Sequence, residues 1–378
     1  MTFKASLQNK IIQSLPNNYG IENYDEYRFG TYDATLRTKE ERVSEKIKKT
    51  LKKNVKKLIK HRSGFEHYVK KAEEMTAPYL REFESMWLHL NPTDKDVLIS
   101  LLAYRVMGWR KVKLPRNNKS YWQAIETAKT LVNYDDVYDP NFMHFMLHKF
   151  NLRTIDYNID LYFSESRVAV DFIIEQYAYK LKGETLIEAQ EGDVVLDIGG
   201  CWGDTALYFS DKVGAKGKVF SFEFIPRNIE LFNININFNP ELKSTIELIE
   251  QPVSNLSGDM VYFKDHGPGS KVQFQPFEDQ TGTTKTISID DFVNSKSLDT
   301  VDFIKMDIEG AEPVALEGAI ETIKRFRPKL AIAIYHSMND FAKIPNWILD
   351  LDLDYEIHIG HYTIHAEETI CFAKPKAR

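Results

Sequence analysis

Titratable side chains come directly after two short apolar runs in the second half of the sequence. Asp307 directly follows the run Val301–Met306, and His336 directly follows the run Leu330–Tyr335. In an open α/β sheet, ligands bind outside the carboxyl ends of the strands, so both side chains would face a bound molecule. A histidine there has a pKa suited to proton abstraction near neutral pH, and a carboxylate can do the same work. We expect His336 or Asp307 to be a general base, with Glu309 orienting the acceptor.

A glycine-rich turn follows another apolar run, Val194–Ile198. It reads Asp-Ile-Gly-Gly-Cys-Trp-Gly-Asp-Thr from Asp197 onward. Glycine allows a sharp bend and a close approach of the backbone to a ligand. The dinucleotide fingerprint Gly-x-Gly-x-x-Gly cradles a pyrophosphate, but here the glycines read Gly-Gly-x-x-Gly and an acidic side chain would repel that group. The turn instead suits the cationic end of a methionine moiety. The residues expected to bind this ligand are Asp197, Gly199, Gly200, Trp202, Gly203 and Thr205.

A second acidic residue marks the end of the next apolar run, Lys218–Phe222. Glu223 lies some twenty residues after the turn, where a carboxylate can accept hydrogen bonds from both ribose hydroxyls. Asn228 is assigned to the same ligand, and so is Gln251, which follows the run Ile246–Ile249 and would lie by an adenine. These assignments predict a nucleoside-containing ligand.

Together these motifs resemble the FkbM-type methyltransferases. The resemblance covers about residues 160–375 and rests on the turn from Asp197, on Phe222-Glu223, on Ile289-Asp290 and on the run from Asp302 to Glu312. The Lys-x-Asp-x-Glu-Gly-x-Glu pattern within that last run is its most specific part. After Glu223 many members carry proline directly, whereas this sequence reads Phe-Ile-Pro.

The resemblance implies a fold, a cofactor and a reaction. The fold is α/β, the Rossmann-like class I methyltransferase fold with a mostly parallel seven-stranded sheet. The methyl donor is S-adenosyl-L-methionine, and the methyl group usually goes to a hydroxyl oxygen. Known members act on polyketide, sugar and glycan hydroxyls, and we favour a sugar or glycan acceptor on that ground.

The chain divides into two parts by pattern. We expect a helical N-terminal region over residues 1–155, with a role in acceptor recognition or partner binding, and the methyltransferase domain over 156–378. In the second part, apolar runs alternate with helical stretches, which favours a parallel sheet. Runs at Tyr355–Ile359 and Thr369–Ala373 would close that sheet, and a β-rich insertion spans about residues 260–289.

Three helices are expected in the N-terminal region. Apolar residues recur every fourth position from Val43 to Ile59, and lysines crowd the other faces between Lys46 and Lys60. A second helix would start at Thr93, with Asp96 in a capping-box position, and end at Gly108. A third would cover about residues 121–132.

Composition excludes several classes of protein. The net charge of −6 gives no global attraction to nucleic acid, and two cysteines exclude a disulfide scaffold. The N-terminal residues resemble no signal peptide and no run is long enough to span a membrane, so a cytoplasmic protein is expected. No metal ligands are assigned, and the need for a divalent metal is left open.

Two alternatives also stay open at this level. One is a nicotinamide-dependent oxidoreductase on a related sheet, which the glycine spacing and Asp197 disfavour. The other is a non-catalytic protein with a relic methyltransferase fold. In it, the Lys46–Lys60 helix would bind an anionic membrane or a partner, although the plainer interpretation of these lysines is a solvated helix face.

Overall fold

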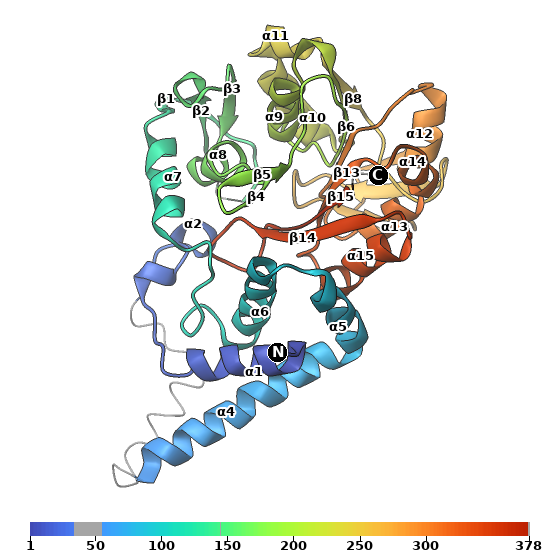
Figure 1. Ribbon diagram of the computed structural model, residues 1–378. Helices are drawn as coiled ribbons and strands as arrows, with labels where there is room; N and C mark the ends of the chain where they lie inside the picture. Colours follow the sequence, from blue (N-terminus) through green and yellow to red (C-terminus); the bar gives the residue numbers. More distant parts are fainter. Residues whose placement is uncertain (34–54, 144, 377–378) are drawn as a thin grey trace. The chain divides into compact units, whose positions relative to one another are not determined.

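The computed structural model describes residues 1–33, 55–143 and 145–376 (Figure 1). The chain forms two compact units, one of residues 1–118 with 363–367 and the other of residues 119–362 with 368–378. The apolar stripe and the lysine run were expected between residues 43 and 60. The part up to residue 54 lies outside the described residues. No helix in the described ranges combines the length and the apolarity needed to cross a bilayer.

The first unit is helical, as expected. Its main helices are α1 (Phe3–Ser14), α2 (Glu26–Phe29), α4 (Val55–Thr76), α5 (Leu80–His89) and α6 (Pro92–Met107). Helix α6 is the buried centre of this unit and contacts both α1 and α4. It begins at Pro92 instead of Thr93, because the Asn91 side chain accepts hydrogen bonds from the backbone amides of Thr93 and Asp94 and so caps the helix. Its expected end at Gly108 is confirmed.

The second unit is built on a seven-stranded sheet. Its strands are β6 (Val194–Ile198), β7 (Lys218–Phe222), β8 (Ile246–Ile249), β12 (Phe303–Met306), β13 (Lys329–Ala333), β14 (Tyr355–His361) and β15 (Thr369–Pro375). Their spatial order is β14-β15-β13-β12-β6-β7-β8, and only β15 runs antiparallel to its neighbours. Counted along the chain this is the order 3-2-1-4-5-7-6, and the expected class I methyltransferase fold is confirmed.

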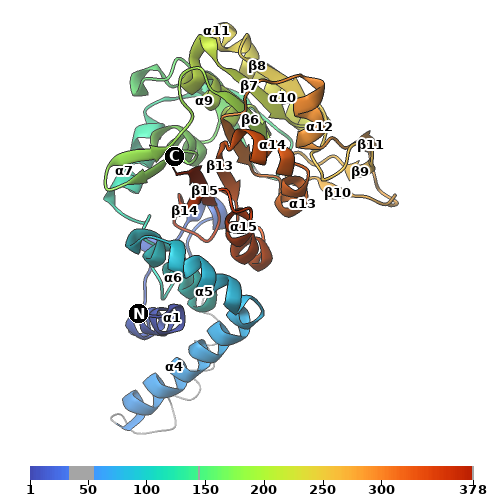
Figure 2. The same ribbon diagram turned by 45° about the vertical axis from the view of Figure 1, so that its right-hand side comes forward.

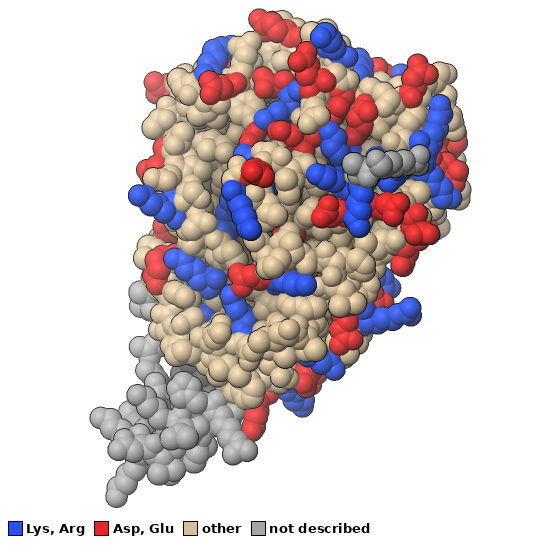
Figure 3. All heavy atoms as spheres, in the orientation of Figure 1, with Lys and Arg blue, Asp and Glu red and all other residues tan. Residues whose placement is uncertain are grey.

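Helices follow the strands and cover the sheet. They are α9 (Asp204–Val213), α10 (Pro226–Asn237), α11 (Pro240–Lys243), α12 (Ile289–Ser295), α13 (Glu312–Glu317), α14 (Ile320–Phe326) and α15 (Met338–Asp350). Every residue of β12 is buried, as are nearly all of β6 and β13, which explains why these strands read as unbroken apolar runs. On the face shown in Figure 3, basic and acidic side chains are interspersed.

The expected β-rich insertion forms its own small sheet. Strands β10 (Lys271–Gln273) and β11 (Gly282–Lys285) pair antiparallel with β9 (Met260–Lys264). Figure 2 shows it at the edge of the unit, clear of the seven-stranded sheet.

A three-stranded sheet before the main one was not predicted. It consists of β1 (Val132–Tyr138), β2 (Leu147–Asn151) and β3 (Asp160–Phe163), and α7 (Lys119–Lys129) precedes it. Helix α7 packs on α8 (Glu165–Val168) and on the helical segment Ala169–Ile173. Because of these contacts the sheet-containing unit begins at Lys119, whereas the sequence pattern placed the division after residue 155.

Asn235 of α10 and Asn239, just beyond its end, attach the sheet β1–β3 to the main sheet. Asn235 accepts a hydrogen bond from the Tyr162 amide (2.8 Å) and donates to the carbonyl of Trp202 (2.9 Å). One turn later, Asn239 accepts from the Asp160 amide (2.8 Å) and donates to the Asp160 carbonyl (2.7 Å). The side-chain amides of Asn235 and Asn239 thus pair with the edge of β3, and Asn235 also fixes the glycine-rich turn.

Replacing Asn235 with alanine should therefore destabilise this unit. Asn235→Ala leaves buried backbone groups without partners and should lower the free energy of unfolding by about 1–3 kcal/mol in urea denaturation. Asn233→Ala, at an exposed position of the same helix, should change it by less than about 0.5 kcal/mol. Equal effects of the two substitutions would contradict the bridging role.

Candidate active site

A buried ion pair joins the two central strands of the sheet. The register of β6 and β12 places Lys305 opposite Asp197, and Lys305 Nζ lies 3.0 Å from Asp197 Oδ1. Both side chains are almost completely buried. The ammonium also donates to the Gly199 carbonyl (2.6 Å), so it binds the first peptide of the glycine-rich turn. Burial lowers the pKa of Lys305, but the carboxylates of Asp197 and Asp307 outweigh it and raise the pKa above its usual value.

Protein donors occupy both oxygens of Asp197. Thr205 donates to Oδ1 at 3.0 Å and to Oδ2 at 2.9 Å, and Ser221 donates to Oδ2 at 2.7 Å. Asp197 thus connects β6, β7, β12 and the start of α9. Asp197 and Thr205 were predicted to contact the ligand; the structure gives both a part in holding the turn, and their direct contact with a ligand stays a prediction.

The glycines of the turn are required by close contacts. Gly199 has a φ of +92°, and a Cβ there would lie 2.0 Å from the backbone oxygen of Asp307. A Cβ on Gly200 would lie 2.1 Å from Ser221 Oγ. Gly203 also has a positive φ and precedes α9. The turn that follows β6 is therefore pressed directly against the residue that follows β12.

Trp202, the other residue of the turn that was expected to bind the ligand, is buried. Its ring meets that of Phe163 edge to face at 6.4 Å. This contact gives Trp202 a packing role, and the predicted shielding of a ligand is untested.

Glu223 lies at the end of β7 beside the same turn. Its Oε1 accepts hydrogen bonds from the amides of Phe224 (2.8 Å) and Ile225 (2.7 Å), and its Oε2 accepts from Asn228 Nδ2 (3.2 Å). Burial raises the pKa of Glu223 to about 7, against the effect of these donors and of the Cys201 amide. Glu223, Asn228 and the turn are thus brought together, as predicted from their order in the sequence.

The side chain of Gln251 lies against the β-rich insertion. Its side-chain amide points at the Lys285 carbonyl, 3.5 Å away in the β-rich insertion. Its expected place beside an adenine stays a prediction.

Asp307 lies just beyond β12 and is held by two tyrosines. The Tyr335 hydroxyl lies 3.1 Å from Asp307 Oδ1, and the Tyr177 hydroxyl donates to Oδ2 at 3.2 Å. Burial raises the pKa of Asp307, and the nearby Glu368 carboxylate acts in the same direction. Its side chain keeps 15% of its surface exposed, so the carboxylate can be reached from outside.

The predicted base His336 lies between carboxylates. Its Nε2 is 3.4 Å from Asp307 Oδ1, and its Nδ1 is 3.2 Å from Glu312 Oε1. Burial lowers the pKa of His336, but the contact with Glu312 and the charges of Asp307 and Glu309 outweigh it and raise the pKa to about 9. The imidazole is therefore mostly protonated at neutral pH in the absence of other ligands.

Glu309 lies on the open side of this cluster. Its side chain is 75% exposed and its Oε2 is 3.7 Å from His336 Nε2. Its φ of +57° is in the left-handed region, as is that of Gly310, so a strained turn presents the carboxylate. The three predicted catalytic residues thus form one group.

Several residues of this group were not assigned from the sequence. Lys305 and Glu312 belong to the most specific motif, and a lysine inside an apolar strand is a signal that could have been used. A chain of hydrogen bonds and ion pairs behind Asp307 gave no such signal, because it joins the segment 167–177 to Glu368 and Asp307, which are far from that segment in sequence. It runs through Tyr177, Gln176, Glu368 and Arg167 to Asp171.

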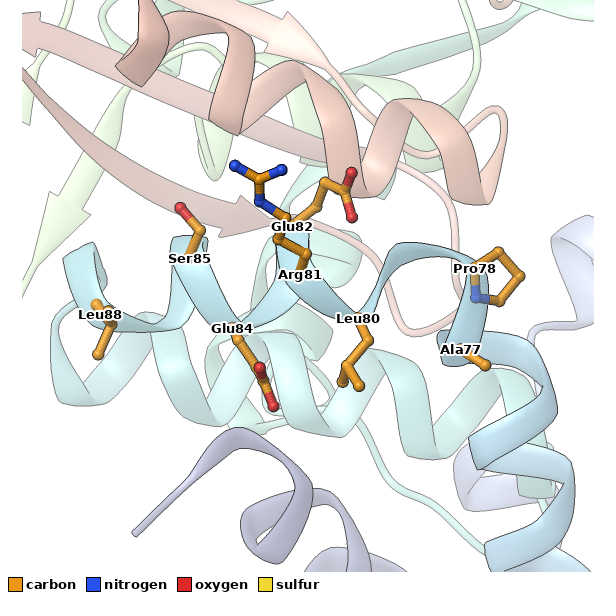
Figure 4. Close-up of a pocket in the computed structure, with 8 residues that line it drawn as sticks. All are labelled: Ala77, Pro78, Leu80, Arg81, Glu82, Glu84, Ser85 and Leu88. Atoms are coloured by element: carbon orange, nitrogen blue, oxygen red, sulfur yellow. The ribbon is translucent and has the colours of Figure 1, made fainter.

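A surface depression of about 640 Å³ lies in the helical unit, away from these residues in the sequence. Figure 4 shows its lining side chains along α5 and the turn before it. They are Ala77, Pro78, Leu80, Arg81, Glu82, Glu84, Ser85 and Leu88. None of them was assigned to the site, and no role is assigned to the depression.

Comparison with known proteins identifies the domain. Residues 187–357 match the family model of the methyltransferase FkbM domain. The hexuronic acid methyltransferase AglP of Haloferax volcanii is 29% identical over 139 residues, which are 37% of this chain and 55% of AglP. The chain thus spans about half the length of this curated relative. The resemblance drawn from the motifs is confirmed over the matched segment.

Solved structures of methyltransferases also resemble the chain. The methyltransferase FkbM from Methylobacillus flagellatus has a TM-score of 0.49 at 18% identity, covering 82% of this chain and 64% of that one. Fibrillarin from Aeropyrum pernix, solved with S-adenosyl-L-methionine, has a TM-score of 0.32 at 15% identity, covering 64% and 98%.

The ion pair under the turn should be indispensable for stability. Lys305→Met leaves Asp197 charged and buried without its cation, and should cost about 3–5 kcal/mol in the free energy of unfolding. The double variant Asp197→Asn/Lys305→Met should regain part of this loss. Chemical denaturation measures both, with Lys285→Met at an exposed position as the control. A loss no larger for Lys305→Met than for the control would contradict the argument.

Proposed function

We propose that this chain, which contains a methyltransferase FkbM domain at residues 187–357, transfers a methyl group from S-adenosyl-L-methionine to a hydroxyl oxygen of a sugar or glycan. The observation that carries the proposal is the contact of the glycine-rich turn with the group formed by Asp307, Glu309 and His336. Gly199 lies against the backbone of Asp307, whose side chain contacts His336. A donor bound at the turn would have its reactive end next to groups that can take a proton.

The residues around the turn fit an adenosyl cofactor. Glu223 is a nearly buried carboxylate with acceptor capacity left on Oε2, as two ribose hydroxyls require. The Oδ1 of Asn228 is buried and has no hydrogen-bond partner among the described residues, so a ligand donor can satisfy it. The glycines at 199 and 200 keep side chains out of the turn, which lets a ligand approach the backbone.

The acceptor side supplies position and a proton acceptor. S-adenosyl-L-methionine carries a methyl group that is already activated on a cationic sulfur, so the protein must align the acceptor and remove one proton. As the acceptor oxygen gains the methyl group, its proton passes to the Asp307 carboxylate, or to His336 in the fraction of molecules whose imidazole is neutral. The exposed Glu309 carboxylate is placed to accept a hydrogen bond from a neighbouring hydroxyl of the acceptor.

The choice of a sugar rests on the relative AglP, a hexuronic acid methyltransferase. The family match also favours methyl transfer over a nicotinamide-dependent reaction. We keep acceptor recognition as the proposed role of the helical N-terminal unit. This role can be tested by exchanging that unit's exposed residues once an acceptor is known.

The charge state of Glu223 should control cofactor affinity. Its pKa is raised to about 7, so it is mostly neutral at pH 6 and mostly charged at pH 8. A charged carboxylate accepts stronger hydrogen bonds from ribose hydroxyls. The affinity for S-adenosylhomocysteine, measured by calorimetry, should therefore increase from pH 6 to pH 8. Glu223→Gln should bind more weakly and lose this dependence; a variant with the wild-type profile would refute the assignment.

Removal of His336 should separate catalysis from cofactor binding. With labelled S-adenosyl-L-methionine and a panel of nucleotide sugars, polysaccharides and lipids, we expect transfer of label to a sugar hydroxyl. His336→Ala should keep the affinity for S-adenosylhomocysteine and lower the rate at least about 10²-fold.

The matched control is His89→Ala, at an exposed position of the helical unit, which should keep the wild-type rate. An unchanged rate in His336→Ala would remove this residue as the base. Label found only on lipid, or on no member of the panel, would overturn the sugar acceptor.

A further inference from the structure

We propose that Asp307, Glu312 and His336 together bind a divalent cation. Each offers a ligand atom, and these three atoms lie within 4.8 Å of one another. Glu312 Oε1 is 3.2 Å from His336 Nδ1, and Asp307 Oδ1 is 3.4 Å from His336 Nε2. Ligands about 2.1 Å from Mg²⁺ are roughly 3 Å from their neighbours in an octahedral shell. One ion takes only one nitrogen of the His336 ring, and the 4.8 Å spread of the three ligand atoms is wider than such a shell, so binding would draw the side chains closer together around the ion.

Unsatisfied buried atoms support this cluster independently of its composition. Glu312 is fully buried, yet its Oε2 has no hydrogen-bond partner in the described part of the chain. Neither ring nitrogen of His336 makes an aligned hydrogen bond there, although carboxylate oxygens are near both. A buried polar atom without a partner destabilises the fold, so such atoms are uncommon unless a ligand satisfies them. A cation between these side chains would satisfy Glu312 and one imidazole nitrogen together.

Groups behind the ligands already hold two of them in place. The Tyr335 and Tyr177 hydroxyls orient the Asp307 carboxylate. The backbone amide of Ile308 donates to Glu312 Oε1 at 2.8 Å and leaves Oε2 for another partner. Such outer contacts are typical of metal ligands, whose orientation they fix.

The donor set selects the class of cation. Two carboxylates and one imidazole favour Mg²⁺ or Mn²⁺, which prefer oxygen ligands. Structural Zn²⁺ is usually bound by thiolates, and this cluster contains none. Three protein ligands leave positions open on the side where Glu309 is exposed. Acceptor hydroxyls could bind there, and the cation would lower their pKa. This part of the inference rests on the proposed function, whereas cation binding itself does not.

Manganese provides a direct test that needs no methyl transfer. We expect the full-length protein to bind about one Mn²⁺ in a saturable manner when free Mn²⁺ is followed by electron paramagnetic resonance. Pulsed measurements on the bound ion should show the nitrogen coupling of a coordinated imidazole. Labelling the histidines with ¹⁵N should alter that coupling, and this readout requires no variant. In His336→Gln the coupling should disappear.

Two further variants assign the carboxylate ligand. Glu312→Gln keeps the size of the side chain and should weaken Mn²⁺ binding at least tenfold. Glu317→Gln removes one exposed charge from the same helix α13 and should bind as the wild type does. Circular dichroism verifies the folding of both variants.

The outcomes separate the two proposals. Absence of saturable binding, or binding without nitrogen coupling, would overturn the cation site and leave His336 as the proton acceptor of the proposed reaction. Mn²⁺ binding with the expected coupling, but no methyl transfer to any sugar, would support the cation site and contradict the proposed acceptor.

Discussion

The ion pair between Lys305 and Asp197 is the interaction on which the site depends. It lies near the ends of the two central strands, and both charges are buried, so each depends on the other for neutralisation. Removing water from two charges costs several kcal/mol for each ion, which only good geometry and further hydrogen bonds can offset. Thr205, Ser221 and the Gly199 carbonyl supply those bonds. The same contacts that neutralise the pair fix the shape of the turn.

From this point the two halves of the site follow by geometry. Because β6 and β12 are parallel neighbours in register, the residues after them must meet, and Gly199 is small enough to let them do so. The turn on one side offers backbone and Glu223 to a nucleoside. The side chains after β12 and β13 offer carboxylates and an imidazole. One sheet edge therefore holds a binding half and a proton-handling half without any loop having to bring them together.

The sequence was sufficient to predict the seven-stranded sheet, but not the sheet β1–β3 or the residues that hold Asp307 from behind. All seven strands were predicted, because their residues read as apolar runs. The sheet β1–β3 was missed, since β1 is largely exposed and polar and has no regular alternation. Glu223 and Asp307 could be found because they come directly after strands, and His336 because it follows closely after β13. Tyr177 could not, because it lies 130 positions before the carboxylate that it contacts, and nothing local marks that partnership.

The place of β15 has a consequence for the order of folding. It is the last strand in sequence, yet it lies between β13 and β14 and pairs with both. Because β13 ends at Ala333 and β15 begins at Thr369, β13 is synthesised first, and one of its edges has no partner strand until β15 follows. Such an edge can join other chains and aggregate. A nascent chain would therefore hold most of the site's residues while still lacking the strand that closes the sheet, and protection by a chaperone would matter most in that interval.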